Sequence, residues 1–336
     1  MSGEARTGST GGLAAGAPRR RPGWVTVARK EFADHVNSVR LTIVIGLLAL
    51  TAIAAVYAAA GQIRDVASEA TGDPSLFLRL FVLEFGDTAF DFTFFTFVSL
   101  VGPLLGIVFG FDAVNSERSE RTLPRLVAQP IYRDDIINGK FVAGLSVIAL
   151  VLAGLTAVVA GVGIVRLGIV PTPVDIARLV SWLVLSIVYV GFWLAFALLC
   201  SVLLRRAATS ALTAIGVWIV ASLFATFIVQ IVADTFAPVP EQPTAQEALA
   251  NVRLRQTLGR FSPGFLYEEA ASAILTPEIR TLGFSLSLLD PRAVPSRLSL
   301  PQSLSIVWPQ TVALVALTIG AFAIAYVVFM REEIRA

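Results

Sequence analysis

Six stretches of this chain contain no charged residue, and each is long enough to cross a lipid bilayer as a helix. They are residues 41–60, 92–111, 141–165, 179–204, 207–233 and a run within 304–330. The hydrocarbon core of a bilayer is about 30 Å thick, so about 20 helical residues are needed to span it. A backbone in lipid must satisfy its own hydrogen bonds, which makes runs of this length helical. The sequence therefore predicts an all-α integral membrane protein with six transmembrane helices over residues 41–330.

The composition supports a membrane location. Of the 336 residues, 56% are hydrophobic and 15% are charged, and the mean hydropathy is +0.76. A soluble domain carries nearer a quarter charged residues, so a bilayer must cover much of this apolar surface. The net charge is only +2, which gives no indication of nucleic-acid binding.

The chain lacks the common catalytic and nucleotide-binding motifs. Cys200 and His35 are the only residues of their kind, which excludes an intramolecular disulfide and a metal site built from histidines. Gly139 and Lys140 lack the upstream glycine and the following hydroxyl of a phosphate-binding loop. No carboxylate lies in the middle of a predicted span, which argues against an ion-coupled carrier. We therefore expect no enzyme activity and no cofactor in this chain, and any transport would need a partner that supplies energy.

The N-terminal region divides into two parts. Residues 1–23 are rich in Gly, Ala, Ser and Arg, which predicts a disordered tail. Between residues 24 and 37, apolar side chains recur at helical spacing, which predicts an amphipathic helix in the membrane interface. An ordinary juxtamembrane linker is the alternative.

The distribution of Lys and Arg predicts the orientation. The segments 1–40, 112–140, 205–206 and 331–336 share one side and contain 16 Lys and Arg against 10 Asp and Glu. The opposite side contains 10 and 14. We therefore expect both termini, including the tail 331–336, to be cytoplasmic.

Two external insertions are expected, at 61–91 and 234–303. The first contains a Phe-rich stretch with helical spacing and is followed by further phenylalanines to Phe97, which either seal a pathway or form an aromatic belt with ordinary helix packing. In the second, Thr244 and Glu247 have the spacing of a capping box, and residues 267–275 indicate another helix. This insertion predicts a small helical external segment before the sixth span.

Three glycines in the second span recur every four residues. Gly102, Gly106 and Gly110 therefore line one face of a helix and allow another backbone to approach closely. Tight helix packing and a moving joint are both compatible with this pattern.

The segment 112–140 is strongly charged and joins two predicted spans on the basic side. Leu123 and Leu126 give it a short apolar edge, and Pro130 interrupts it. It is either a docking segment for a soluble partner or a solvated turn between two helices.

This segment resembles the one that follows the second membrane helix in permease subunits of type-2 ABC transporters, the ABC-2 class. The matching positions are Gly110, Asp112, Glu117, Arg118, Thr122, Leu123, Leu126, Pro130, Arg133, Gly139 and Lys140. The run from Ala28 to Phe32 resembles the family's N-terminal interfacial helix, and Phe261, Ser262 and Pro263 resemble its external segment. The branch that includes the permease of the nitrous-oxide-reductase maturation system is the most similar. Arg121 and Pro124 depart from the family pattern.

The resemblance implies a permease subunit of an ATP-driven exporter in the cell membrane. It implies a pair with a second copy or a paralogue, contact with membrane lipids, and separate ATPase subunits that bind ATP and Mg. A cytoplasmic coupling helix between helices 2 and 3 would dock on the ATPase. The implied interface comprises Asp112, Glu117, Arg118, Glu120, Arg121, Thr122, Leu123, Arg125, Leu126, Pro130, Arg133 and Lys140. A membrane scaffold that anchors a cytoplasmic partner without moving cargo is the alternative, and the sequence does not name a cargo.

Overall fold

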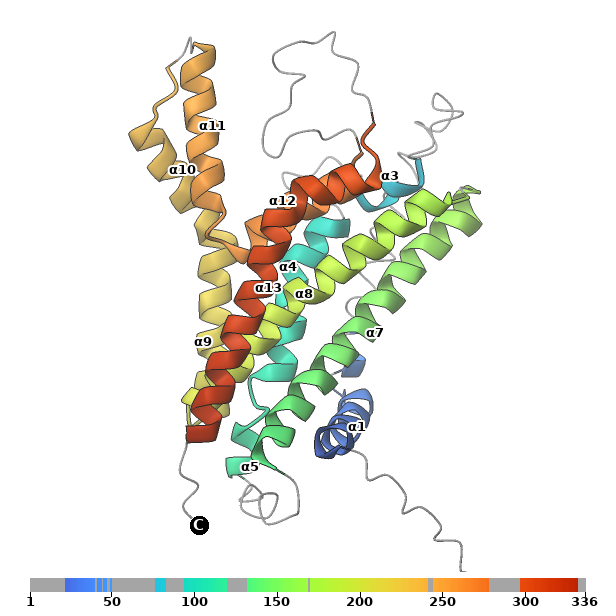
Figure 1. Ribbon diagram of the computed structural model, residues 1–336, viewed down its shortest axis with the longest axis vertical. Coiled ribbons are helices and arrows are strands. Elements are labelled where there is room, and N and C mark those ends of the chain that lie inside the picture. Colours follow the sequence, from blue (N-terminus) through green and yellow to red (C-terminus); the bar gives the residue numbers. More distant parts are fainter. Residues whose placement is uncertain are drawn as a thin grey trace, which may run out of the picture.

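Helices make up all the regular structure in the residues that the computed structural model describes. These residues are 22–39, 41–43, 45–46, 49, 76–82, 94–119, 132–168, 170–240, 244–277 and 297–331. The elements are α1 (Gly23–Val36), α3 (Leu76–Val82), α4 (Phe94–Gly110), α5 (Asn115–Ser119), α7 (Arg133–Leu167), α8 (Pro173–Leu203), α9 (Ala207–Ile219), the π-helix η1 (Val220–Phe224), α10 (Ala225–Phe236), α11 (Ala245–Gly259), α12 (Pro263–Leu275) and α13 (Leu300–Arg331). Figure 1 shows the long helices as an inclined bundle, with α1 and α5 at one end and α11 and α12 toward the other.

Within these residues, five helical segments are long and apolar enough to cross a membrane. They are Phe94–Glu117, Arg133–Val165, Pro173–Leu203, Ala207–Phe236 and Leu300–Arg331. They correspond to the second to sixth runs predicted from the sequence. The first expected span, 41–60, lies largely outside the described residues, as do the tails 1–21 and 332–336 and most of the insertion 61–91. The number of six spans therefore stays a prediction.

Helix α8 forms the centre of the bundle, where it packs against α4, α7, α12 and α13. The glycines of α4 face it. A Cβ atom added at Gly106 would lie 2.6 Å from the carbonyl oxygen of Val190, and one at Gly110 would lie 2.7 Å from that of Leu194. Side chains at these positions would collide with backbone, so the small residues allow α4 to lie directly on α8.

Two of the helices begin well before the charge-free runs that predicted them. Helix α7 starts at Arg133, and α8 starts at Pro173 behind a capping box between Thr172 and Asp175. The second start brings Arg178 into the core, where it is 2% exposed. Its guanidinium donates to the carbonyl oxygens of Ile274 and Leu298, and so holds the end of α12 and the segment before α13.

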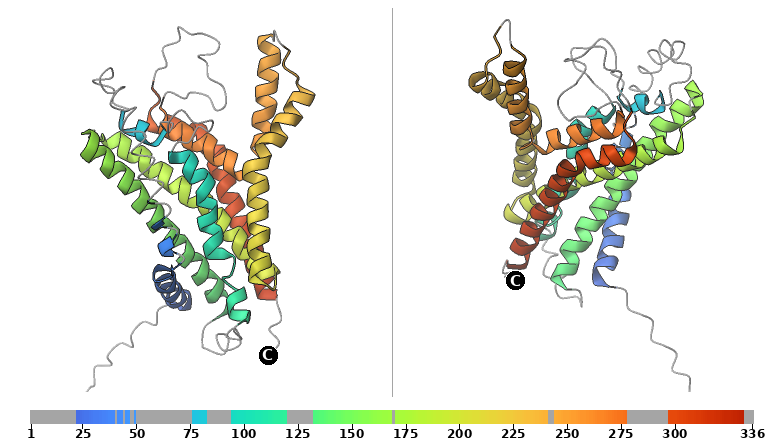
Figure 2. Two further views of the ribbon diagram at one scale, coloured as in Figure 1. Left: turned by 180° about the vertical axis from the view of Figure 1, so that it is seen from behind. Right: turned by 45° about the horizontal axis from the view of Figure 1, so that its top comes forward.

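The described part of the insertion 234–303 packs partly into the bundle. The capping box of Thr244 and Glu247 is confirmed at the start of α11. Helices α10 and α11 form a hairpin that extends past the other helices in both views of Figure 2. Helix α12, in contrast, is buried against α8 and α13, and Tyr267 is completely covered. It begins at Pro263, earlier than the 267–275 expected.

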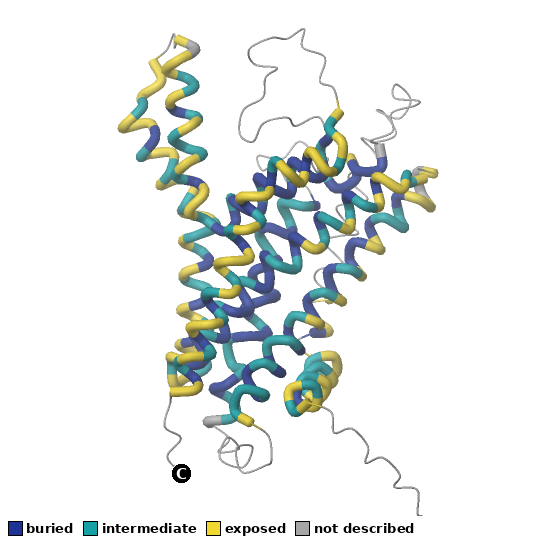
Figure 3. Tube along the Cα trace, viewed as in Figure 1, coloured by how far each residue is buried: buried dark blue, intermediate teal, exposed yellow. Residues whose placement is uncertain are grey.

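The phenylalanines at the start of α4 contribute to packing. Phe94 is 1% exposed and lies 5.5 Å from Phe81 and 5.7 Å from Trp182 between ring centroids. By contrast, η1 and α10 expose most of their large apolar side chains, and Leu212 and Val217 of α9 are exposed as well, as the yellow segments of Figure 3 show. An apolar surface of this extent is normal where lipid or another membrane helix covers it.

Candidate functional site

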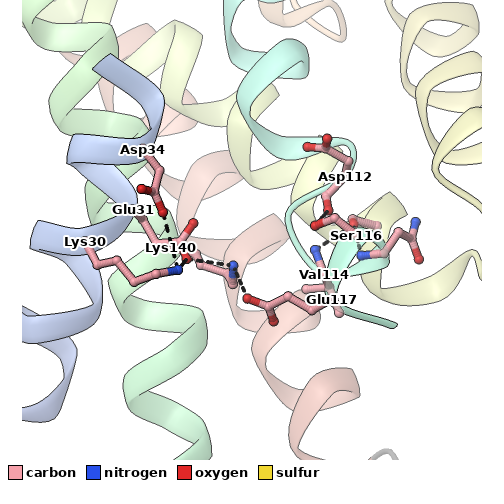
Figure 4. A network of polar contacts seen from close by, with 10 residues as sticks. Lys30, Glu31, Asp34, Asp112, Val114, Ser116, Glu117 and Lys140 are labelled. Atoms are coloured by element: carbon pink, nitrogen blue, oxygen red, sulfur yellow. Dashed lines mark hydrogen bonds and ion pairs between the residues drawn. The ribbon is translucent and has the colours of Figure 1, made fainter. Parts of the chain in front are cut away.

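Three elements meet around one lysine at the end of the bundle that holds α1 and α5. Lys140, on the second turn of α7, places its Nζ 2.7 Å from Oε1 of Glu117 on α5. The same Nζ lies 3.2 Å from Oε1 of Glu31 on α1. Lys140 is 7% exposed, so this ammonium is shared between two carboxylates away from most solvent (Figure 4). We call Lys140, Glu117 and Glu31 the junction.

The start of α7 holds α1 through three successive contacts on one face. The backbone N–H of Trp24 donates to Oδ1 of Asp135 at 2.9 Å, which places a carboxylate at the positive end of α1. One turn further, a Cβ atom at Gly139 would lie 2.7 Å from Val27, so the two helices touch there. Lys140 then adds the ion pair to Glu31. Helix α1 is therefore fixed along the first two turns of α7.

The turn between α4 and α5 is held against α8. Oγ of Ser201 accepts hydrogen bonds from the backbone N–H groups of Val114, at 3.1 Å, and Asn115, at 3.3 Å. Both residues are buried, and so is Ser201. These bonds satisfy donors at the start of α5 that have no partner within so short a helix.

The junction continues toward solvent on α1. Lys30 lies 3.5 Å from Glu31 and 3.3 Å from Asp34, and its side chain is 66% exposed. Burial lowers the pKa of His35, the next residue, whose ring packs edge-on against Phe109 at 5.0 Å. The imidazole is therefore neutral down to a lower pH than a free histidine.

The structure separates the predicted interface residues into groups. Glu117 and Lys140 come together with Glu31, and Lys140 is buried between the two carboxylates. Arg133 turns toward α13, where it donates to the carbonyl oxygen of Phe329 at 3.1 Å. Asp112 lies in the turn before α5, and Arg118 is part of α5. Glu120, Arg121, Thr122, Leu123, Arg125, Leu126 and Pro130 lie outside the described residues.

Sequence reasoning did not identify three residues of this arrangement. Glu31 belongs to the run from Ala28 to Phe32, but the residues of this run do not indicate an ion pair with Lys140. Asp135 and Ser201 carried no signal, because each acts on a backbone group far away in the chain.

The junction has the chemistry of a mechanical connection. Its groups are an ammonium and two carboxylates, each of which places one oxygen within 3.2 Å of the ammonium nitrogen. In the described part of the chain, no group of three His, Cys, Asp or Glu side chains could hold a metal ion. The arrangement joins α1, α5 and α7 through one buried ammonium.

Comparison with known proteins identifies the family of this chain. No curated protein matches it significantly. The family model described as "ABC-2 family transporter protein" matches residues 25–334, which includes the junction and all five long helices. The chain is thus a multi-pass membrane protein that belongs to the ABC-2 family of transporter proteins.

Proposed function

We propose that this chain is the permease subunit of an ATP-driven exporter, and that segment 112–140 docks on a separate ABC ATPase. Membership of the ABC-2 family supports a membrane transport component that works with ATPase subunits of the ABC type. In this proposal two permease chains pair in the cell membrane, and one ATPase binds each of them from the cytoplasm.

The observation that carries the proposal is the ion pair between Glu117 and Lys140. These residues stand just before and just after segment 118–139, so their 2.7 Å contact brings the two ends of that segment together. The same ammonium reaches Glu31 on α1. A protein that moves the segment would therefore move α4, α7 and α1 together. Without the ion pair between Glu117 and Lys140, the segment could be displaced while these helices stayed in place.

The docking contacts are assigned to residues within this segment. Arg118, Glu120, Arg121 and Arg125 would orient the ATPase, and Leu123 and Leu126 would fill an apolar pocket on it. Lys140, being covered, takes the role of a positioning residue. The excess of Lys and Arg on this side supports a cytoplasmic location for the segment and both termini. Helix α1 would then lie at the inner membrane surface, beside the expected first span.

The orientation is tested by labelling single cysteines. Cys200 is the only cysteine, so Cys200→Ala provides a background to which Ala128→Cys or Ser287→Cys is added. In intact cells, a membrane-impermeant maleimide is expected to label position 287 and to reach position 128 only after permeabilisation. Labelling of position 128 in intact cells would place the segment out of reach of a cytoplasmic ATPase and would refute the proposal.

The coupling is tested with two kinds of variant in the complex purified from its native membrane. Arg121→Ala combined with Arg125→Ala is expected to reduce the amount of ATPase that co-purifies. Glu117→Gln should leave the ATPase bound but weaken the response of ATP hydrolysis to cargo in reconstituted vesicles, because it loosens the junction. An ATPase that remains bound but never responds to any cargo would favour the membrane scaffold instead.

A further inference from the structure

A cavity of about 520 Å³ lies at the other end of the bundle from the junction. This size is within the range of small-molecule sites. Four elements surround it: the first turns of α4, the segment from η1 into α10, helix α11, and the start of α12. Its apolar wall includes Leu100, Val229, Val252 and Phe265, and Gln230 and Gln256 add two amide groups.

One carboxylate in the cavity wall has spare hydrogen-bonding capacity. Oε1 of Glu268 accepts a hydrogen bond from the hydroxyl of Ser99 at 2.7 Å, and Oε2 has no hydrogen bond or ion pair. The neighbouring Glu269 is the opposite case, because it accepts from Gln256, Arg260 and Gln310. Burial raises the pKa of Glu268, which follows from the shortage of partners. Of the two adjacent carboxylates, only Glu268 is available to a ligand.

The cation in the cavity wall does not neutralise Glu268. Arg255 on α11 directs its Nη2 to Oδ1 of Asp234 at 2.7 Å, so its charge is balanced by a carboxylate of the α10–α11 hairpin. Arg255 and Glu268 are the two ionisable residues among those that line the cavity, and of the two only Glu268 has no charged partner among the described residues. The cavity is therefore complementary to a positive charge.

The wall opposite α4 contains a π-helical turn. Residues Val220–Phe224 form η1 between α9 and α10, and short π segments inside α-helices often lie at functional sites. The carbonyl oxygen of Ala221 in this turn accepts a hydrogen bond from Oγ of Ser262 at 2.8 Å, just before the start of α12. This bond ties the two walls of the cavity together.

We propose that this cavity binds an amphiphile with an ammonium or other organic cation, which pairs with Glu268 while its apolar part lies against Leu100, Val229 and Phe265. Resting on the proposed exporter function, we assign this class of molecule as the cargo. Ser99 holds the carboxylate in place. The amide of Gln230, which also lines the cavity, is available to the remainder of the molecule.

The proposal is tested by binding of rhodamine 6G, a fluorescent lipophilic cation, to the purified chain in lipid nanodiscs. Fluorescence polarisation is expected to show saturable binding that octylammonium displaces and octanoate does not. Glu268→Gln, which keeps the shape of the side chain, should weaken binding at least about tenfold, since it removes a charge-assisted contact. Unchanged binding by Glu268→Gln, or equal displacement by octanoate, would overturn the proposal.

Two further variants keep the result interpretable. Ala225→Phe fills the cavity without removing the carboxylate, and it should also abolish binding. Glu247→Gln removes one negative charge outside the cavity and retains a side chain that can complete the capping box of α11, so it should bind as the original chain does. If Ala225→Phe binds normally while Glu268→Gln does not, the site lies elsewhere and the proposal fails.

The binding experiment contains no ATPase, so its outcome does not depend on the coupling proposed above. If rhodamine 6G binds but does not stimulate ATP hydrolysis in the assembled complex, the cation site is supported and the proposed exporter function is contradicted. If rhodamine 6G still stimulates ATP hydrolysis in the Glu268→Gln complex, the exporter function is supported and the cation site at Glu268 is contradicted.

Discussion

The two ends of the bundle differ in how many partners their buried charged group has. At the junction, the Lys140 ammonium is enclosed by Glu31 and Glu117, and Lys30 and Asp34 extend the network to solvent. At the cavity, the Glu268 carboxylate has one hydroxyl as its partner and an open volume beside it. A fully paired charge fixes the elements that carry it, because separating them leaves a charge uncompensated. A charge with spare capacity costs stability in the empty protein and is suited to a ligand.

Helix α4 connects these two ends. Its first turns contribute Ser99 and Leu100 to the cavity, and its last residue lies two positions before Asp112, at the turn that Ser201 holds. In the second half of α4, Gly106 and Gly110 allow the helix to pack directly against the backbone of α8. The following predictions test this contrast, from the largest expected effect to the smallest.

Removal of the central ammonium should have the largest effect on stability. Lys140→Ala leaves Glu31 and Glu117 facing each other in a covered site, and we expect a loss of about 3–5 kcal/mol in the free energy of unfolding. Lys30→Ala is the matched control, because its pairs are exposed and should contribute less than about 1 kcal/mol. Denaturant titration in mixed micelles measures both. If the two variants were equally stable, the junction would be an ordinary surface network.

Widening the contact between α4 and α8 should have an intermediate effect. A methyl group at Gly106 meets backbone atoms of Val190 and Leu194, so Gly106→Ala should cost about 1–3 kcal/mol. Gly154→Ala in α7 is the control, because nothing lies within 4 Å of the added Cβ atom and the helix gains a better helix former. A Gly106→Ala protein as stable as Gly154→Ala would show that α4 does not rest rigidly on α8.

The smallest effect concerns the pH dependence of stability. Because burial raises the pKa of Glu268 in the folded protein, stability should fall as the pH rises from the pKa of the unfolded chain through that of the folded one. The nearby titratable groups are Arg255, the hydroxyls of Tyr189 and Tyr267, and Glu269. The first three keep their charge in this range. Burial alone would raise the pKa of Glu269, but hydrogen bonds from Arg260, Gln310 and Gln256 outweigh it and lower that pKa, so Glu269 ionises below this range. The melting temperature of Glu268→Gln, relative to that of the original chain, should therefore increase as the pH rises above the ordinary pKa of a glutamate, and level off above the pKa of Glu268 in the folded protein. A difference that stays constant with pH would mean that Glu268 is as well solvated as a surface carboxylate.

The sequence predicted the parts of the fold that depend on length and apolarity. Five of the six charge-free runs are recovered as long helices, and the four-residue glycine spacing in α4 matches its contact with α8. Helix starts were less predictable, because capping groups set them. The box of Thr172 and Asp175 starts α8 inside a charged stretch that had been excluded from the span.

The candidate sites were less accessible to sequence reasoning, since both depend on tertiary packing. Lys140 was assigned to the ATPase interface from the family resemblance, and spacing alone placed neither Glu31 nor Glu117 beside it. Glu268 and Glu269 are adjacent in the chain, and their different partners follow from the positions of α4, α11 and α13. The residues proposed to contact an ATPase between Glu120 and Pro130 stay a prediction.

The π-helical turn at Val220–Phe224 sets the rotation of everything that follows it. A π turn corresponds to one residue inserted into an α-helix, and one residue is worth about 100° of rotation. Deleting a single residue there would let α9 and α10 continue as one regular α-helix, but it would swing Gln230 and Asp234 round the helix axis. The cavity would lose an amide from its lining and Arg255 would lose its counter-ion, although no residue of α11 or α12 had been touched.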